Sequence, residues 1–496
     1  MYALHLAAEC APLAQAGGLA DVVAALPAAL RAEGIRASVA LPLYGGPGGA
    51  MARQAGALDR VWTGDVGGFD ATVWHAVDLD TPTFLVETPA FAAEGVYLDA
   101  VGEALPDARF VSFQRTVLAW LRAAPHDRPS VLHLHDHHAA LVPALLTGDP
   151  ANDVLSDLPT VLTVHSADHQ GALLTNELVE AGIDPDLVAA MRSSADSDGV
   201  LNALRIGVST ADAVVVPSPT YAAELRGDGV APRGLGRVFR TAREQTVGVL
   251  HGVDRAVWNP ACDPHLPAPF TPDDLRGKRL AKDAVCRELG LDPGRPLLAF
   301  IGRLMPENGV EILFEAVERL LGRTEAGIAI LGLGPPEQEA RLRGLGALVR
   351  AQDAGERLAV RNAFDVPFAH RLVAGADVLL APARTEPSAR TAMIALAYGT
   401  VPVAHAVGAL RDVVCPGDAP PRGVCFDGFG TTPFVEAVEG ALDRLANADS
   451  WRALQHAGMT AAFSWQTTAQ RIAGVYQDVS ESGTRSVADS DRFLVR

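Results

Sequence analysis

The sequence predicts an α/β protein made of two separate units, each with its own parallel sheet. Short apolar runs alternate with helical periodicity through both halves of the chain. The alternation starts anew with a buried run near residue 296. The chain has 496 residues, of which 49% are hydrophobic, so it exceeds one ordinary core and has enough apolar residues for two.

The first half opens with a strand, a helix and a second strand. "YALHLAA" (2–8) is typical of a buried strand, and "LADVVAALPAALRAEG" (19–34) places its apolar residues on one helical face. Gly34 is a natural helix stop, whereas Pro27 should kink the helix or shift its start. "IRASVALPLY" (35–44) follows as a strand, and this βαβ order implies parallel strands. Later strands of this half are expected at residues 130–135, 160–165 and 212–218.

The second half repeats the pattern. We expect a strand at 296–304, a helix at 310–322 and further strands at 327–334 and 376–384. The stretch from residue 227 to about 293 is rich in Pro, Gly, Asp and Arg, and we expect it to hold the connection between the units.

Charge and cysteine content restrict the function. A net charge of −18 argues against a nucleic-acid or anionic-membrane binder, although a local cationic pocket could still hold a phosphorylated ligand. The five scattered cysteines indicate a reducing compartment without a disulfide framework, and a Cys415–Cys425 pair is disfavoured. Without a leader pattern or a run of 18 apolar residues, a cytoplasmic protein that does not bind membranes is expected. Nothing in the sequence specifies an oligomeric state.

Polar residues follow several predicted strands, and open parallel sheets bind ligands at that edge. The pair Gly17 and Gly18 lies between the first strand and helix, where backbone N–H groups can approach an anion. A simple tight turn is the alternative. The spacing is not GxGxxG, so no dinucleotide is inferred.

Histidines gather at the ends of two further strands. "HLHDHHAAL" (133–141) could hold a metal through His133 and His137, but a strand that runs into a helix turns these side chains apart. A rim on which Asp136 binds substrate hydroxyls fits better. His165 ends the next strand in "TVHSADHQG", and it is the second polar cluster at an equivalent place.

The second half carries arginines at strand ends. Arg303 follows one strand, and Arg384 and Glu386 follow another. Guanidinium groups bind phosphate in a bidentate manner, so these three residues indicate a site for a diphosphate sugar, with surface ion pairing as the alternative. Gly332 and Gly334 at another strand end add a weak signal.

Taken in order, several segments resemble the bacterial glycogen synthase and plant starch synthase family. They include "AAECAPLAQAGGLADVVAALPAAL", "HLHDHHAALVPALL", "TVHSADHQG", "IGRL", "AGADVLLAPARTEPS", "YGTVPV" and "FSWQTTAQRIAGVY", and they extend to about Tyr476. The resemblance implies two Rossmann-like domains that face each other across a deep cleft (GT-B type). It places the first domain at 1–245, the second at 246–455, a closing helix that crosses back at 456–479 and a flexible tail at 480–496.

The resemblance also implies the reaction and the roles of residues. Glucose would pass from ADP-glucose to the non-reducing end of an α-1,4-glucan, with retention and without a metal or cofactor. Glu9 and Asp21 would flank the Gly-Gly loop on the acceptor and sugar side, Asp136 would be a cleft carboxylate, and His165 would face the transferred sugar. Arg303 would neutralise the diphosphate, and Glu386, Ser388 and Thr391 would occupy the family's E-P-C-G-L-T segment.

Several positions depart from the family. Gln15 and Asn308 stand where the family has lysines, and Ala389-Arg390 replaces glycine-leucine. A lost cation near a leaving diphosphate typically costs on the order of 100-fold in rate. If the Ala389 position requires a positive φ, its methyl group would also push the backbone away from a phosphate. Arg390 could restore the missing charge.

Three functions therefore remain open. The first is a working glucosyltransferase with compensated phosphate contacts. The second is a weakened paralogue that binds glucan or nucleotide and acts through interaction. The third is a transferase that uses another donor, such as UDP-glucose, or another acceptor.

Overall fold

The chain divides into two compact units. In this computed structural model the described residues are 1–98, 104–124, 127–192, 199–242, 244–351, 357–363 and 365–482. Unit 1 consists of residues Met1–Pro217, Leu225–Val249 and the C-terminal segment from Trp465, and unit 2 consists of Ser218–Glu224 and Leu250–Ser464. Most of the tail expected at 480–496 lies outside the described residues.

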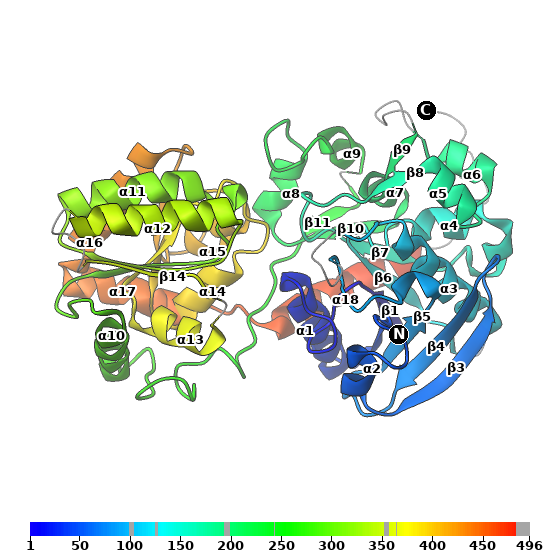
Figure 1. The fold of residues 1–496 in the computed structure, drawn as a ribbon, viewed down its shortest axis with the longest axis horizontal. Coiled ribbons are helices and arrows are strands. Elements are labelled where there is room, and N and C mark those ends of the chain that lie inside the picture. Colours follow the sequence, from blue (N-terminus) through cyan, green and yellow to red (C-terminus); the bar gives the residue numbers. More distant parts are fainter. Residues whose placement is uncertain are drawn as a thin grey trace. The chain divides into compact units, whose positions relative to one another are not determined.

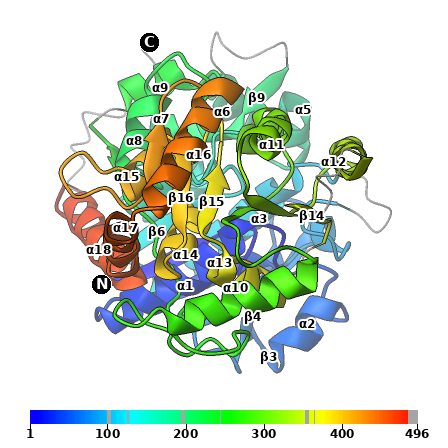
Figure 2. The ribbon, with the colours of Figure 1, turned by 90° about the vertical axis from the view of Figure 1, so that its left-hand side faces the viewer.

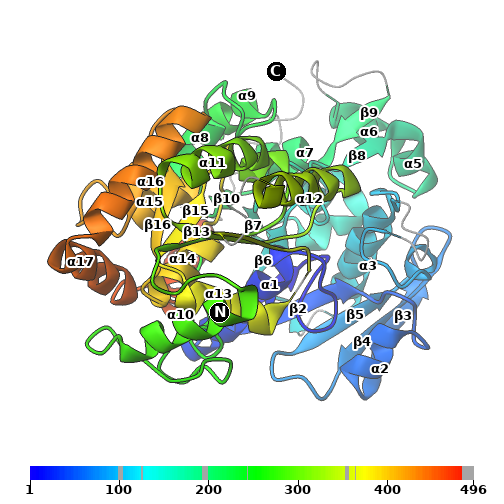
Figure 3. The same ribbon diagram turned by 60° about the vertical axis from the view of Figure 1, so that its left-hand side comes forward.

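Unit 1 is built on a nine-stranded sheet of order β11-β10-β7-β6-β1-β2-β5-β4-β3. The strands from β11 to β5 run parallel, and β4 and β3 pair antiparallel at one edge, where Figure 3 shows them beside β5. A short β8-β9 pair lies apart from this sheet. The strands are β1 (Tyr2–Leu6), β2 (Arg36–Pro42), β3 (Leu58–Asp65), β4 (Asp70–Ala76), β5 (Thr83–Glu87), β6 (Val131–His135), β7 (Thr160–Thr163), β8 (Ala172–Leu174), β9 (Val200–Asn202), β10 (Ala213–Val216) and β11 (Thr246–Gly248).

The helices of unit 1 include the first and last helices of the chain. They are α1 (Gly18–Ala32), α2 (Ala50–Ala55), α3 (Arg109–Ala123), α4 (Val142–Gly148), α5 (Thr175–Glu180), α6 (Pro185–Ala190), α7 (Ala203–Thr210), α9 (Gly236–Thr241) and α18 (Trp465–Ser482), with the 3-10 turns η1 (Pro89–Phe91) and η3 (Pro150–Leu155). Helix α1 begins at Gly18 and continues through the buried Pro27. Of the two effects expected of this proline, a kink or a shifted start, the shifted start does not occur.

Helix α18 returns to unit 1 and completes its core. It packs against α1, as Figure 1 shows. Its residues Ile472 and Tyr476 join Leu26 and Leu30 of α1 and Val161 of β7 in one buried cluster. Burial of this apolar surface favours the return at roughly 25 cal/mol per Å².

Unit 2 has a six-stranded parallel sheet of order β14-β13-β12-β15-β16-β17. Its strands are β12 (Leu297–Ile301), β13 (Gly327–Leu331), β14 (Leu358–Arg361), β15 (Val378–Ala381), β16 (Val401–His405) and β17 (Val424–Phe426). Its helices are α8 (Pro219–Leu225, of which the last residue belongs to unit 1), α10 (Arg276–Leu289), α11 (Val310–Arg323), α12 (Pro336–Ala351), α13 (Val366–Gly375), α14 (Arg390–Ala397), α15 (Gly408–Val414), α16 (Thr431–Leu445) and α17 (Ala448–Met459), with the 3-10 turn η4 (Pro306–Asn308).

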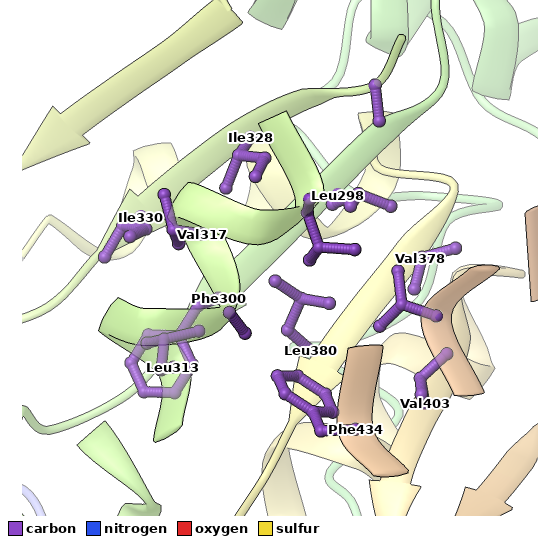
Figure 4. Close-up of a cluster of buried hydrophobic side chains, with 14 of the residues drawn as sticks. Leu298, Phe300, Leu313, Val317, Ile328, Ile330, Val378, Leu380, Val403 and Phe434 are labelled. Carbon is purple, nitrogen blue, oxygen red and sulfur yellow. The ribbon is translucent and has the colours of Figure 1, made fainter. Parts of the chain in front are cut away.

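Helices cover both faces of this sheet (Figure 2). Successive strand residues point to opposite faces. Leu298 and Phe300 of β12 therefore pack with α11 and α16, in the cluster drawn in Figure 4. Leu297 and Ala299 of the same strand pack instead with α10 and α13.

The chain crosses between the units at several points rather than one. The crossing after Val249 lies inside the expected connection, but residues 218–224 already belong to unit 2. Residues 456–464, expected in the closing helix, belong to unit 2, because α17 runs to Met459 and α18 begins only at Trp465.

A disulfide joins Cys415, directly after α15, to Cys425 of β17. The expectation of five unpaired cysteines is therefore wrong for this pair. Its Cα atoms are 6.4 Å apart, within the range a disulfide spans, because β17 returns beside the end of α15. In the part of the chain that is described, no helix is both long and apolar enough to cross a membrane.

Candidate functional site

The loop between β1 and α1 is held by the Glu9 carboxylate. Its Oε2 atom accepts hydrogen bonds from the backbone N–H groups of Ala16 and Gly17, both at 2.6 Å. Its Oε1 atom accepts one from the Tyr97 hydroxyl at 2.6 Å. Glu9 is only 2% exposed, so these three donors supply the stabilisation that a buried carboxylate needs.

This arrangement changes the expected role of the Gly-Gly loop. Gly17 caps α1 in an extended conformation, with φ −149°, and its N–H is committed to Glu9 rather than to an external anion. Gly18 opens the helix, and Gln15 is exposed on the loop. Asp21 lies half-buried in the first turn of α1.

Asp136 follows β6 in a left-handed conformation, with φ +53°. Its Oδ1 atom accepts a hydrogen bond from the His165 backbone N–H at 2.7 Å, which joins the ends of β6 and β7. Burial raises the pKa of Asp136 to about 7, against backbone hydrogen bonds that lower it, and the charge of Glu9 adds to the increase. Asp136 and His165 are thus joined by a hydrogen bond, and the charge of Glu9 acts on Asp136. That these residues form a substrate rim stays a prediction.

Behind His165, buried imidazole rings form a hydrogen-bonded row. The His165 Nε2 atom lies 3.0 Å from Nδ1 of His135, and Nε2 of His135 lies 3.1 Å from Nδ1 of His5. His133 stacks on His135 with ring centroids 4.5 Å apart. Burial lowers the pKa of His5 to about 3 and that of His133 well below its ordinary value, so both rings are neutral.

These rings also offer the one grouping of metal-ligating atoms found among the described residues. One ligating atom each from His5, His133 and His135 lies within 4.8 Å of the others. The nitrogens already form hydrogen bonds within the row, and the rings stack instead of converging on one point. The pair weighed from the sequence is not brought together, because His137 contacts Asp107 at 3.5 Å while His133 belongs to the row.

In unit 2 the Glu386 side chain caps the start of α14. Its Oε1 atom accepts hydrogen bonds from the N–H groups of Ala389, at 2.9 Å, and Ser388, at 3.2 Å. Burial raises the pKa of Glu386, while these hydrogen bonds and the charge of Arg303 lower it. Ala389 has φ +51°, so the position does adopt the left-handed conformation that favours glycine.

A small cavity of about 60 Å³ lies beside this cap, at the ends of β12 and β15. Asn308, Glu386, Ala389 and Thr391 line it. The Oδ1 atom of Asn308 is buried without a hydrogen-bond partner. An uncharged amide with a free acceptor thus occupies the place where the family has a lysine.

The arginines at the strand ends are not gathered around Glu386 as expected. Arg384 lies 2.5 Å from Glu311, and its guanidinium stacks over Phe429 at 4.1 Å. The exposed Arg303 lies 3.6 Å from Glu307. Its charge lowers the pKa of Glu386, but no hydrogen bond or ion pair between the two is described. Ion pairing, the alternative considered for these arginines, describes Arg384 well.

The remaining expected residues fall into two groups. Gly332 and Gly334 allow close packing, since a Cβ atom there would lie 2.4 Å from the Gly302 carbonyl and 2.6 Å from Leu304. Ser388 and Arg390 flank the positive-φ residue, with Arg390 exposed as the first residue of α14.

Sequence reasoning missed Tyr97, His5 and Tyr476, whose hydroxyl lies 2.6 Å from Nδ1 of His133. Tyr97 had no sequence signal, because it lies 88 residues from Glu9. His5 could have been found, since a histidine inside an otherwise apolar strand is unusual and needs partners.

Comparison with known proteins gives the family. Residues 3–241 match the starch synthase catalytic domain, and residues 282–452 match the glycosyl transferases group 1. A glycogen synthase from Anaeromyxobacter is 36% identical over 97% of this chain and 100% of its own length. The chain belongs to the glycogen and starch synthase family. A glycogen synthase 2 from Geobacter metallireducens is 32% identical over 97% of this chain and 99% of its own.

Solved structures give the same family and fold. The catalytic domain of starch synthase IV from Arabidopsis thaliana, bound to ADP and acarbose, has a TM-score of 0.83 at 27% identity, covering 97% of this chain and 99% of that one. Sucrose-phosphate synthase from Thermosynechococcus elongatus shares the fold, with a TM-score of 0.60 at 17% identity, over 97% and 99% of the chains. This member of the family is a hexosyltransferase with the two-domain GT-B fold.

Proposed function

We propose that this glycogen synthase relative transfers glucose from ADP-glucose to the non-reducing end of an α-1,4-glucan, with retention and without a resident metal or cofactor. Among family members this donor and acceptor fit the starch synthase whose structure holds ADP and acarbose. The observation that carries the proposal is the cavity at the start of α14, where Glu386, Asn308 and Thr391 meet.

Unit 2 would hold the diphosphate. The N–H groups of Ser388 and Ala389 are donors suited to phosphate oxygens, and Glu386 accepts from both. An incoming phosphate would compete with this carboxylate for them. Because burial raises the pKa of Glu386, its carboxylate takes up a proton more readily, and the neutral carboxyl group would repel the phosphate less. Arg303 would stabilise the charge that develops as the sugar–phosphate bond breaks.

Unit 1 would hold the sugar and the acceptor. Asp136 and His165 lie at adjacent strand ends and offer groups that bind hydroxyls. Glu9 would act indirectly by shaping the loop before α1, since its oxygens are engaged by Ala16, Gly17 and Tyr97. The leaving diphosphate oxygen would take the proton of the acceptor hydroxyl.

A second candidate function is glucan or nucleotide binding with weakened turnover. Asn308 favours it, because a neutral amide lines the cavity in place of a cation. A third candidate keeps transfer but uses UDP-glucose. The cytoplasm stays the proposed location, and a reducing cytoplasm would open the Cys415–Cys425 pair.

The deciding experiment is transfer of labelled glucose into glycogen from ADP-glucose, with UDP-glucose in parallel. We expect incorporation from ADP-glucose, increased about tenfold or more in the Gln15→Lys, Asn308→Lys double variant. Gln477→Lys is the matched control, because it adds a positive charge at an exposed position of α18. Incorporation only from UDP-glucose would refute ADP-glucose as the donor and favour the third candidate. Glucan binding without transfer, even in the double variant, would favour the second candidate.

A further inference from the structure

Unit 2 has a second, larger cavity at the edge of its sheet opposite to the Glu386 cavity. Its volume is about 410 Å³, a size typical of small-molecule sites, and we call it the α10 cavity. Gly375 and Asp377 line it and precede β15, whereas Glu386 follows that strand. Asp377 also accepts a hydrogen bond from the N–H of Leu297 at the start of β12, at 2.8 Å. The two cavities share no lining residue, so a ligand in one leaves the other free.

The α10 cavity is cationic, although the protein has a net charge of −18. Five basic and three acidic side chains line it. Four of the basic residues come from the first two turns of α10, namely Arg276, Lys278, Arg279 and Lys282. The N-terminal end of a helix carries a partial positive charge, so acidic residues are favoured there, yet α10 has none in its first turn. A bound anion would offset this unfavourable gathering of charge.

Three of these basic side chains are engaged by the protein itself. The buried Lys278 ammonium donates to four oxygen atoms of unit 2, at 2.8–3.0 Å. Lys282 pairs with Asp377 at 2.7 Å, and Arg276 pairs with Asp274 at 2.6 Å. These side chains therefore hold α10 in place and are not the groups that a ligand would bind.

The other two basic side chains have no carboxylate partner. Among the described residues, no hydrogen bond or ion pair of the Arg279 side chain is found. Arg452 of α17 donates only to the backbone carbonyl of Asp273, at 2.9 Å. Both arginines are exposed and line the cavity, and they come from two helices that lie next to each other in Figures 1 and 3. Because guanidinium groups match the geometry of phosphate oxygens, this pair favours a phosphate group as the ligand.

Apolar side chains and one unsatisfied donor complete the lining. Trp451 of α17 is 5% exposed, and its indole N–H is buried without a hydrogen-bond partner in the described part of the chain. Leu275 and Leu445 also line the cavity. An unpaired buried donor is unfavourable, and an oxygen atom of a ligand would satisfy it. The ligand should therefore carry a carbon skeleton with oxygen atoms as well as its phosphate.

We propose that the α10 cavity is a second binding site of this protein, for the phosphate monoester of a small hydroxylated metabolite. Arg279 and Arg452 bind the phosphate, and the carbon skeleton lies against Trp451. The proposal does not depend on the reaction at the Glu386 cavity.

Isothermal titration calorimetry of the full-length protein at constant ionic strength tests this site, with ribose 5-phosphate and inorganic phosphate as the two probes. We expect ribose 5-phosphate to bind about tenfold more tightly, because its sugar contacts the apolar lining. The Arg279→Ser, Arg452→Ser double variant should bind both probes about 100-fold more weakly, as for lost hydrogen bonds to charged groups. Trp451→Phe should weaken ribose 5-phosphate alone.

Two controls locate the site. Arg60→Ser, Arg237→Ser makes the same change of charge at exposed positions of β3 and α9 in unit 1, and it should bind like the wild type. Asn308→Lys alters the Glu386 cavity and should leave the affinity for ribose 5-phosphate unchanged.

Three results would overturn the proposal. The first is absence of ribose 5-phosphate binding to the wild type at millimolar concentration. The second is wild-type affinity in an Arg279→Ser, Arg452→Ser protein that is folded by circular dichroism. The third is equal affinity of the wild type for the two probes, which would leave the apolar lining without a role.

Discussion

The backbone N–H of Ala389 lies 2.9 Å from the Glu386 carboxylate, while Ala389 itself is held at φ +51°. The capping contact thus requires a conformation that an L-residue with a Cβ atom adopts at a cost of roughly 1–2 kcal/mol. The same residue lines the small cavity beside Glu386.

Ala389→Gly should therefore increase the free energy of unfolding by about 1 kcal/mol, because glycine adopts this conformation without strain. Ala395→Gly is the matched control, since it makes the same exchange in the interior of α14 and should lower stability by about 1 kcal/mol. Urea titration measures both. Equal destabilisation by the two variants would show that the left-handed conformation carries no strain.

Asp136 should make stability fall as pH rises. Its pKa of about 7 in the folded protein exceeds the ordinary value of 3.8, so the folded state binds the proton more tightly. The stabilisation that Asp136 gives to the folded state is complete below about pH 4 and is lost as the pH rises to about 7. Between pH 5 and 6 the wild type should lose about 1 kcal/mol per pH unit relative to Asp136→Asn. Parallel pH profiles of the two unfolding free energies would contradict this.

Removing the Glu9 carboxylate should loosen the loop before α1. Glu9→Ala leaves the N–H groups of Ala16 and Gly17 without their acceptor, so we expect a loss of about 1–3 kcal/mol and faster amide exchange at both residues. Glu94→Ala, which removes an exposed carboxylate bonded to the N–H of Ala50, should cost less than about 0.5 kcal/mol. Unchanged exchange at Ala16 in Glu9→Ala would refute the capping role.

Arg390 should supply part of the positive charge that is missing because Asn308 stands where the family has a lysine. Arg390→Ala is expected to lower kcat/KM for ADP-glucose by about 100-fold, as for other electrostatic stabilisers of a leaving group. Arg444→Ala removes the same charge from an exposed position of α16 and should leave the rate unchanged. Steady-state kinetics decide, and equal rates in the two variants would exclude Arg390 from the reaction.

Elements with a strong local signal were predictable from the sequence. The buried runs that become β12 and β15 are continuous and apolar, and β6 is apolar except for His133 and His135. Asp136, Arg303 and Arg384 follow β6, β12 and β15 at the sheet edge. The strain at Ala389 was also predictable, because a positive φ at this position depends only on the local backbone. The family resemblance then added the reaction and the order of the domains.

Long-range partners were not predictable. Arg384 is paired with Glu311, 73 residues away, and Tyr476 meets His133 across 343 residues. Such contacts depend on how sheets and helices pack, which periodicity does not encode. The disulfide was missed for a similar reason, because only the return of β17 beside the end of α15 brings its cysteines together.

The return of α18 to unit 1 has a consequence for synthesis of the protein. The first 249 residues leave the ribosome before the helix that covers Leu26, Leu30 and Val161 has been made. Until Ile472 and Tyr476 emerge, that apolar face stays uncovered while the whole of unit 2 is translated and folds. Unit 1 is thus begun first and finished last, and it is the half of the nascent chain that most needs protection from aggregation.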